Sequence, residues 1–345
     1  MIRGRRSLAG VVVAAAAITL VAACSSGSST SGTSSSSSGA SAAGGTSSGG
    51  ASGKTFVVGY SQSNNAEPYR AQLNIQLAYY IKQHKNLKLL PISDAHQDSG
   101  TQVSQVQQFI AQKVDALIVS PNEAAPLTAA VQQACNAHIP VIILDRSVNT
   151  DCFSAFIGGD NVQAGMKAGQ LATQLLPNGG NVVELQGILS NQPQIDRDKG
   201  FRQGIASNPN IHVVAHREAK WLKEDATKVM SQFLSQYKKI DLVYAENDPM
   251  ALGAYLAASS ANRTSQIKFI GTDGLAIPDG GIRAVQQGQL AGTFIYPTCA
   301  MQAADAVAKL VSGQPVEKMQ TLNITGVTPQ NAASLYKQND FSAKA

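Results

Sequence analysis

Short apolar segments alternate with longer amphipathic stretches over most of the chain after residue 54. The apolar segments are rich in β-branched and aromatic residues and therefore predict strands. They cover residues 55–62, 87–93, 115–121, 141–146, 155–160, 181–187, 211–217, 241–247, 267–273 and 291–297. The stretches between them predict helices, for example over 101–113 and 251–261. Alternating strands and helices predict an α/β fold with parallel sheets, and the number of strands favours two sheets in two lobes.

Polar residues follow directly where these strands end. Asp145 and Arg146 come after "VIIL", and Asp273 comes after "IKFIGT". The corresponding position at other strands is held by Asn122, Asp160, Asn161, Gln186 and Asn247. Open α/β sheets bind ligands in the crevice outside the carboxyl ends of their strands. This row of hydrogen-bonding side chains predicts a site for a polar, uncharged ligand.

The first 53 residues carry the pattern of an export signal and a tether. A basic start over residues 1–6 precedes an Ala-rich apolar run over 7–23, and Cys24 follows it. This order predicts a lipoprotein signal peptide over residues 1–23, and the alternative is an N-terminal transmembrane helix, for which the run is short. The pattern "LVAAC" resembles a bacterial lipobox, which implies cleavage before Cys24 and a lipid on its sulfur. Residues 24–53 predict a flexible Ser/Gly-rich tether, so we expect an extracytoplasmic protein anchored to the outer face of the cell membrane.

Charge and motif content argue against several functions. The formal net charge is +5, and arginines of the export signal supply part of it, so the chain shows no nucleic-acid footprint. The sequence contains no GxSxG elbow, Walker loop, HExxH or post-strand GxGxxG, so we expect no catalytic residue, no enzyme activity and no cofactor. The histidines lack metal-binding spacing, and no metal site is expected. A DNA-binding regulator would need a helix-turn-helix where the export signal and tether stand.

Three cysteines follow the predicted tether. Cys135 ends a predicted helix, and Cys152 lies in the loop after the strand over 141–146. An oxidising compartment would allow a disulfide between them, and two separate thiols are the alternative. Cys299 is expected to be a small buried core residue.

Several motifs together resemble one family. The segments "SPNEAAPL", "IPVIILDRS", "NVVELQG", "IDRDKGFRQGI", "VYAENDPMALGA" and "FIGTDG" occur in order between about residues 55 and 328. They resemble the sugar-binding proteins of ABC importers, in the ribose- and galactofuranose-binding branch of the type I periplasmic-binding-protein family. The resemblance implies a monomer with two Rossmann-like lobes and three hinge strands, which encloses a monosaccharide and delivers it to an ABC permease and ATPase complex. The alternative is a receptor that presents a sugar or autoinducer to a membrane sensor.

The resemblance also implies lobe boundaries. We expect an N-terminal lobe over residues 54–158 plus 297–325 and a C-terminal lobe over 159–296 plus 326–345. The chain would then change lobes near 158–160, 296–297 and 324–327.

The family's ligand contacts carry over onto residues of this sequence. Asp145 and Arg146 match an acid–base pair, and Arg197 matches the arginine ahead of "KGF". The further expected contacts are Tyr69, Arg70, Asn122, Trp221, Asn247, Asp273 and Tyr296, and the additional candidates in the loop after the first strand are Asn64, Asn65 and Glu67. Carboxylates accept hydrogen bonds from sugar hydroxyls, guanidinium groups donate to them, and an indole can cover the C–H face of a sugar. Tyr296 replaces a glutamine of the ribose branch, and Arg70 replaces a second aromatic, so plain ribose is disfavoured.

Each of these residues also has a structural interpretation. Asp145 and Arg146 can form a purely structural ion pair, and removing either charge is otherwise expected to abolish binding and leave the fold intact. Arg197 can be a solvated helix charge, and Tyr69 and Trp221 can serve packing alone. Asn247 can be a helix cap, with Asp248 the better cap candidate, and Asp273 can be a turn residue.

Overall fold

The computed structural model describes residues 53–344. The predicted signal peptide over residues 1–23, the lipidation of Cys24 and nearly all of the tether over residues 24–53 lie outside the described residues. No helix between residues 53 and 344 has the length and apolar character that crossing a bilayer requires.

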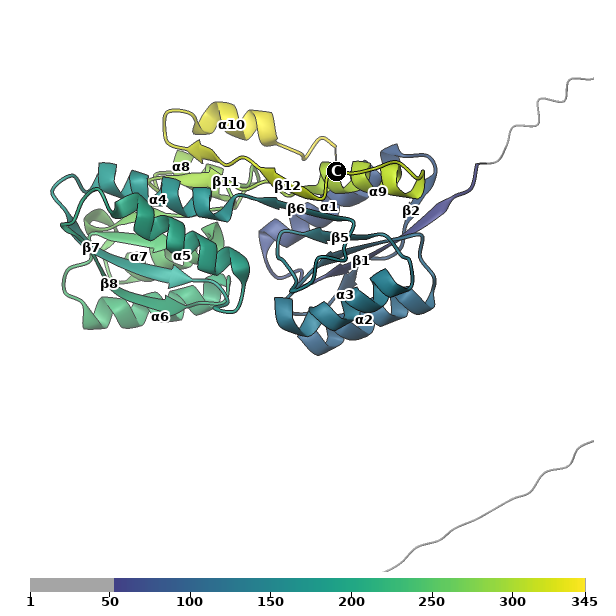
Figure 1. The fold of residues 1–345 in the computed structure, drawn as a ribbon. Coiled ribbons are helices and arrows are strands. Elements are labelled where there is room, and N and C mark those ends of the chain that lie inside the picture. Colours follow the sequence, from purple (N-terminus) through teal and green to yellow (C-terminus); the bar gives the residue numbers. More distant parts are fainter. Residues whose placement is uncertain (1–52, 345) are drawn as a thin grey trace, which may run out of the picture. The chain divides into compact units, whose positions relative to one another are not determined.

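The first lobe contains a seven-stranded sheet, which is parallel throughout (Figure 1). Its order is β12-β6-β5-β4-β1-β2, and β3 also pairs with β1. The strands are β1 (Phe56–Gln62), β2 (Leu87–Leu89), β3 (Ser93–Asp94), β4 (Ala116–Ser120), β5 (Val141–Leu144), β6 (Ala155–Gly159) and β12 (Met319–Leu322). One pair of neighbouring helices is α1 (Pro68–Gln83) with α9 (Ala300–Val311), and the other is α2 (Ser99–Ala111) with α3 (Ala124–Asn136).

The second lobe contains a four-stranded parallel sheet of order β10-β9-β7-β8. Its strands are β7 (Gly180–Gln186), β8 (Ile211–Glu218), β9 (Leu242–Ala245) and β10 (Lys268–Ile270). An antiparallel pair, β11 (Thr293–Ile295) with β13 (Thr325–Val327), is joined to this lobe by single bridges next to β10. The helices are α4 (Asn161–Leu175), α5 (Gln192–Ile205), α6 (Lys223–Gln236), α7 (Asp248–Ser260), α8 (Gly281–Gln286) and α10 (Ala332–Asn339), with a 3-10 turn at Thr264–Gln266.

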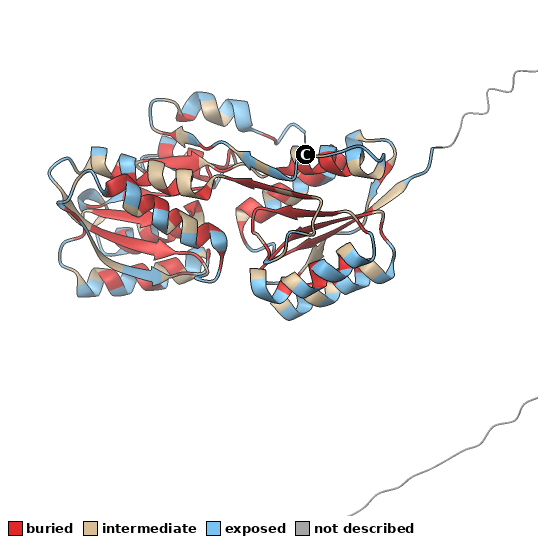
Figure 2. Ribbon diagram, in the orientation of Figure 1, coloured by how far each residue is buried: buried red, intermediate tan, exposed pale blue. Residues whose placement is uncertain are grey.

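The apolar cores explain why the strands read as continuous apolar runs. Strands β4 and β5 are buried along their whole length, and Figure 2 shows buried strands beneath helices that are exposed on their outer sides. Parallel strands covered by helices on both faces have no face toward solvent, so their sequences do not alternate between apolar and polar residues. The three core clusters, with the partly buried side chains packed against them, lie between residues 56 and 336, so a chain that begins at residue 54 keeps all of them.

Each predicted strand segment overlaps an observed strand, and the segment 87–93 contains β2 and the first residue of β3. Strands β12 and β13 were not predicted from their own pattern. β12 is an edge strand that pairs with β6 and alternates between exposed and half-buried residues. Its sequence "MQTL" therefore lacks the apolar signal that marks the central strands.

The chain passes between the two lobes three times. It leaves the first sheet after β6, returns after β11 and leaves again between β12 and β13. Thr325 pairs with Ile295 in β11, so it belongs with the strands of the second lobe rather than with the predicted segment 297–325. Gly159 pairs with Leu322 within the first sheet, so it belongs with the first lobe rather than with the predicted segment 159–296. The other predicted lobe boundaries stay a proposal.

The structure bonds Cys135 of α3 to Cys152, with their Cα atoms 6.1 Å apart. This is one of the two alternatives that the sequence leaves open. Cys299 is a free, buried cysteine at the start of α9, as expected for a core residue.

Candidate functional site

A small cavity lies where strand ends of the two lobes meet. It measures about 20 Å³, room for about one water molecule, so its walls nearly touch. It is lined by Glu67, Tyr69, Arg70, Asp145, Arg146, Pro193, Arg197, Trp221, Asn247 and Asp273. Larger hollows of about 540 and 330 Å³ lie beside β10 and beside the start of α9, and their linings are mainly uncharged. The concentration of charged groups therefore singles out the small cavity as the candidate site.

Arg70 and Asp145 form a buried ion pair at the centre of the wall. Arg70 Nη2 donates to Asp145 Oδ2 over 2.6 Å, and Arg70 Nη1 donates to Ser120 Oγ over 2.6 Å. The two charged side chains are 2% and 5% exposed. Burial opposes ionisation of Asp145, but neighbouring guanidinium groups, that of Arg70 foremost, hold its pKa below the ordinary value.

Arg146 is less tightly paired than its neighbour in sequence. Its Nε lies 3.9 Å from Asp145 Oδ2, beyond hydrogen-bond distance, so the adjacent residues of the sequence motif are not each other's main partners. Its Nη1 donates to the main-chain oxygen of Asn122 over 3.2 Å, and its Nη2 lies 3.7 Å from Glu67 Oε1. Burial and the nearby Arg70 lower the pKa of Arg146 to about 10. Its buried Nε has no hydrogen-bond partner among the described residues and remains a free donor.

Arg197 comes from α5 in the second lobe and is also buried. Its Nε donates to Asn161 Oδ1 over 2.9 Å, and its Nη1 donates to the main-chain oxygen of Glu246 over 2.5 Å. The guanidinium lies over the Trp221 ring, 5.5 Å from its centroid. α4 can approach α5 here because Gly165 has no side chain: a Cβ would lie 2.0 Å from the Arg197 oxygen.

Trp221 is held at the cavity by contacts on several sides. Its ring lies against Gly187, where a Cβ would come within 2.0 Å of it. Its Nε1 donates to Asn191 Oδ1, and its main-chain oxygen accepts from Asn247 Nδ2, both over 3.0 Å. Its backbone has a φ of 69°, a left-handed conformation that is uncommon for a bulky residue.

Asn247 combines the two roles that the sequence gave as alternatives. It lines the cavity, and its Oδ1 caps α7 by accepting from the Met250 amide over 3.0 Å. The expectation that Asp248 is the better cap is wrong. The Asp248 carboxylate instead accepts from Thr293 Oγ1 over 2.6 Å and from the Gly274 amide over 2.8 Å, because it is turned toward the loop after β10.

Asp273 presents a carboxyl that accepts no hydrogen bond from the described residues. Its backbone joins the loop to β11, with the amide donating to the Phe294 oxygen over 3.0 Å. Burial, with the Asp248 carboxyl nearby, raises the pKa of Asp273 well above its ordinary value. The raised pKa favours the protonated form, which both donates and accepts hydrogen bonds, whereas the ionised form only accepts.

Four predicted contact residues do not line the cavity. Asn64 donates to Glu67 Oε1 over 2.8 Å and so stands behind it. Asn65 is exposed and accepts from Asn74. Asn122 is behind Arg146, and its side chain donates to the Gln97 oxygen and to Ser99 Oγ.

Tyr296 is the fourth of these residues. Its hydroxyl accepts from Asn161 Nδ2 and from the Gly159 amide, both over 3.1 Å, so it supports the chain at its first passage between the lobes. Its ring lies 4.6 Å below the Arg197 guanidinium. Tyr296 therefore contacts Arg197, which lines the cavity, and does not line the cavity itself.

Two residues of the site were missed by sequence reasoning. Pro193 lines the cavity at the first turn of α5, where proline reads only as a helix start. Asn191 connects Trp221 to the first lobe, although its position reads as an ordinary helix cap. The only sequence feature that pointed to Asn191 was its polar side chain shortly before the segment that contains Arg197.

Comparison with known proteins matches this chain to binding proteins by family model, by sequence and by structure. The model of the family described as periplasmic binding protein domain matches residues 58–315. The xylitol-binding protein of Mycolicibacterium smegmatis is 35% identical over 69% of this chain and 68% of its own length. The ribose import binding protein RbsB of Bacillus subtilis is 30% identical over 77% of this chain and 85% of its own length. Among solved structures, the fructose binding periplasmic domain of the hybrid two component system BT1754 superposes with a TM-score of 0.79 at 33% identity, over 82% of this chain and 94% of that domain.

Proposed function

Because the chain belongs to the periplasmic binding protein domain family and has its type I fold, we propose that it captures a monosaccharide or polyol between its two lobes and delivers it to an ABC importer. The observation that carries the proposal is the cavity in which both lobes contribute charged and aromatic groups. Arg70, Asp145 and Arg146 come from the first lobe, and Arg197 and Trp221 come from the second.

The chemistry of this wall suits vicinal hydroxyl groups. The free Nε of Arg146 is a donor, and the Asp273 carboxyl can both donate and accept. Hydrogen bonds with charged partners are stronger than neutral ones, and the site contains three guanidinium groups. The indole of Trp221 offers an apolar surface to the C–H face of a carbohydrate. Together these groups support the ligand class that relatives bind by name, ribose and xylitol.

The ligand can enter only if the lobes separate, because the cavity holds about one water molecule when the walls meet. A ligand that contacts both walls favours the closed arrangement, since only that arrangement makes all the contacts. An importer can then distinguish loaded from empty protein by its shape.

A thermal-shift screen of monosaccharides and polyols on the chain from residue 54 onward tests this proposal. A ligand at a hundred times its dissociation constant should add about 2.7 kcal/mol of stability. Ribose, galactofuranose-like sugars and xylitol form the first panel, and calorimetry measures the affinity of each hit. If no member of these classes stabilises the protein, carbohydrate binding is ruled out as its function.

A receptor role is the second candidate, and one comparison favours it. The fructose binding domain that this chain resembles belongs to a hybrid two component system. In that role the same site would present its sugar to a membrane sensor. Uptake of labelled ligand by cells with and without the gene separates the roles, because only an importer component changes uptake directly.

The remaining parts of the proposal concern chemistry and location. The family consists of binding proteins, and we propose that this chain has no catalytic activity and works as a monomer without a cofactor or metal. We also propose that the chain is cleaved before Cys24, lipidated there and held at the outer face of the membrane by its tether. Replacing Cys24 by alanine should release the protein from the membrane fraction, and light scattering of the soluble chain should give the mass of one copy.

A further inference from the structure

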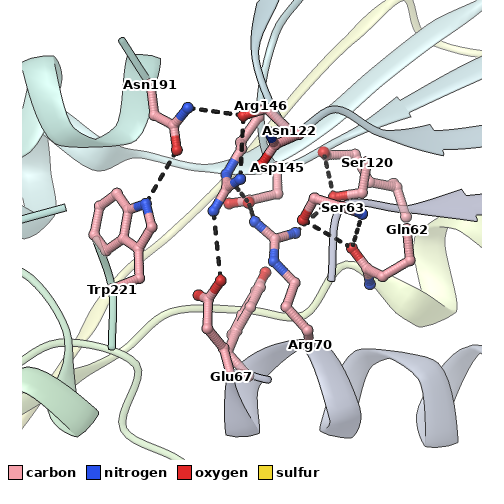
Figure 3. A network of polar contacts seen from close by, with 12 residues as sticks. Gln62, Ser63, Glu67, Arg70, Ser120, Asn122, Asp145, Arg146, Asn191 and Trp221 are labelled. Carbon is pink, nitrogen blue, oxygen red and sulfur yellow. Dashed lines mark hydrogen bonds and ion pairs between the residues drawn. The ribbon is translucent and has the colours of Figure 1, made fainter. Parts of the chain in front are cut away.

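A chain of hydrogen bonds joins Trp221 in the second lobe to the first lobe through one side chain, that of Asn191 (Figure 3). Trp221 Nε1 donates to Asn191 Oδ1 over 3.0 Å, and Asn191 Nδ2 donates to the main-chain oxygen of Asn122 over 2.8 Å. Arg146 Nη1 donates to the same oxygen over 3.2 Å. One carbonyl of the first lobe thus accepts from a cavity arginine and from the second lobe.

The orientation of the Asn191 amide follows from its partners. An indole nitrogen can only donate, so the amide oxygen lies on the Trp221 side. A carbonyl oxygen can only accept, so the amide nitrogen lies on the Asn122 side. Asn191 is 2% exposed, and its side chain makes no cap bond to α5, so its polar atoms serve these two contacts.

Trp221 depends on such supports because its backbone is unfavourable. Trp221 and Lys220 both have positive φ, 69° and 53°, although neither is a glycine. Gly187 and Asn247 fix the ring and the main chain from within the second lobe. The contact through Asn191 differs from these because it continues into the other lobe.

We propose that Asn191 is a positioning residue that couples the approach of the two lobes to the placement of the Trp221 ring. The inference rests on the proposed function, in which a carbohydrate closes the lobes. The Oδ1 bond lies within the second lobe and can persist when the lobes separate. The Nδ2 bond needs the first lobe, so it forms in the closed arrangement alone and slows release of the ligand.

The structure supplies a matched control for this bond. Ser190 Oγ also reaches the first lobe, where it donates to Glu123 Oε1 over 2.7 Å, but this contact is exposed. Water can replace an exposed hydrogen bond at little cost, whereas a buried donor without a partner is costly. Ser190→Ala therefore removes a neighbouring contact between the lobes that should matter little.

The test compares Asn191→Asp, Asn191→Ala and Ser190→Ala with the natural chain from residue 54. Aspartate keeps the acceptor for the indole and loses the donor for Asn122, whereas alanine loses both. The chain has one tryptophan and nine tyrosines, so fluorescence excited at a wavelength that tyrosine does not absorb reports on Trp221 alone. Stopped-flow fluorescence with a sugar or polyol from the thermal-shift screen gives the association and dissociation rates, and small-angle scattering without ligand gives the radius of gyration.

We expect Asn191→Asp to speed ligand dissociation about tenfold and to change the association rate by less than about twofold, since the lost bond exists in the closed form. Ser190→Ala should change neither rate by more than about twofold. The Trp221 fluorescence emission of the ligand-free protein should change in Asn191→Ala. It should match that of the unsubstituted chain in Asn191→Asp, because aspartate still accepts from the indole. This separation of emission from release rate is not expected for a residue that only stabilises the fold.

Two results would overturn the inference without touching the proposed function. One is ligand release from Asn191→Asp at the natural rate, and the other is an equal acceleration in Ser190→Ala. If Asn191→Asp does not fold, the release rate of Asn191→Ala decides the question in the same way. If the natural protein binds no carbohydrate, the proposed function fails, and the bridge must then act in the closed molecules that exist without ligand. Scattering of the ligand-free chain decides this: a larger radius in Asn191→Asp than in Ser190→Ala supports the bridge, and equal radii refute it.

Discussion

Replacing Asp145 by asparagine should destabilise the protein as well as abolish ligand binding. The sequence predicts that removing this charge leaves the fold intact, but the structure buries it between two arginines. Arg70 and Asp145 are 2% and 5% exposed and are joined over 2.6 Å. Asparagine at this position would leave the buried guanidinium groups of Arg70 and Arg146 without their shared carboxylate.

The size of the effect can be estimated from this geometry. Unit charges about 4 Å apart attract by about 4 kcal/mol at an effective dielectric constant of about 20. Breaking a buried pair by removing one partner costs about 3–5 kcal/mol in measured cases. We expect Asp145→Asn to reach that range and Arg70→Met to cost less, because Asp145 would keep Arg146 3.9 Å away. The loss of unfolding free energy in the double variant should be smaller than the sum of the two single losses by at least about 2 kcal/mol, because both substitutions remove the same ion pair.

Urea unfolding of the chain from residue 54 at neutral pH measures these differences in unfolding free energy. An unchanged slope of the free energy against urea concentration shows that the variants unfold in the same transition. The matched control is the exposed pair Lys228 and Asp225, whose side chains are 71% and 34% exposed. Lys228→Met, Asp225→Asn and their double variant should each change stability by less than about 1 kcal/mol. If the buried single variants cost no more than the exposed ones, the reasoning from burial is wrong.

The remaining predictions concern the disulfide, a buried carboxyl and closure. Thiol labelling of the oxidised soluble chain under denaturing conditions should modify Cys299 alone, and labelling of three cysteines would show that Cys135 and Cys152 are not bonded in solution. Because burial raises the pKa of Asp273 in the folded state, stability should fall as the pH rises from the ordinary carboxyl pKa of about 4 toward the higher folded value. Asp273→Asn should therefore lessen this loss in urea unfolding between about pH 4 and pH 8, and an unchanged slope would count against a buried, protonated carboxyl. Small-angle scattering should show a smaller radius of gyration with the correct sugar than without it, and binding with no change in radius would contradict closure by ligand.

The fold could be predicted because its local signals agree. Parallel strands covered on both faces read as apolar runs, and the polar residue after each run marks the carboxyl end of the sheet. Asp145, Arg146, Asn247 and Asp273 meet at one cavity for this reason. β12 escaped prediction because an exposed edge strand needs no apolar sequence.

The partners within the site could not be read from the sequence. Arg70 and Asp145 are 75 positions apart, and only the packing of α1 against the sheet brings them together. The positive φ of Asp145 and of Trp221 turns each side chain in a direction that strand and helix patterns do not describe. Asn122 has the strand-end position of a ligand contact, yet the loop turns its side chain toward Gln97 and Ser99.

The pairing of β6 with β12 has a consequence for the order in which the protein folds. β6 ends at Gly159, and its edge partner begins at Met319, whereas all four strands of the second sheet lie between Gly180 and Ile270. The second sheet can therefore form from a contiguous piece of chain, while the first waits with an open edge that invites wrong pairing. Pairings between distant segments also form slowly, because the loop must close before the contact is gained. β6, the neighbour of the strand that precedes Asp145 and Arg146, thus gains its second partner late, and a nascent chain has a complete first sheet only after residue 322 has been made.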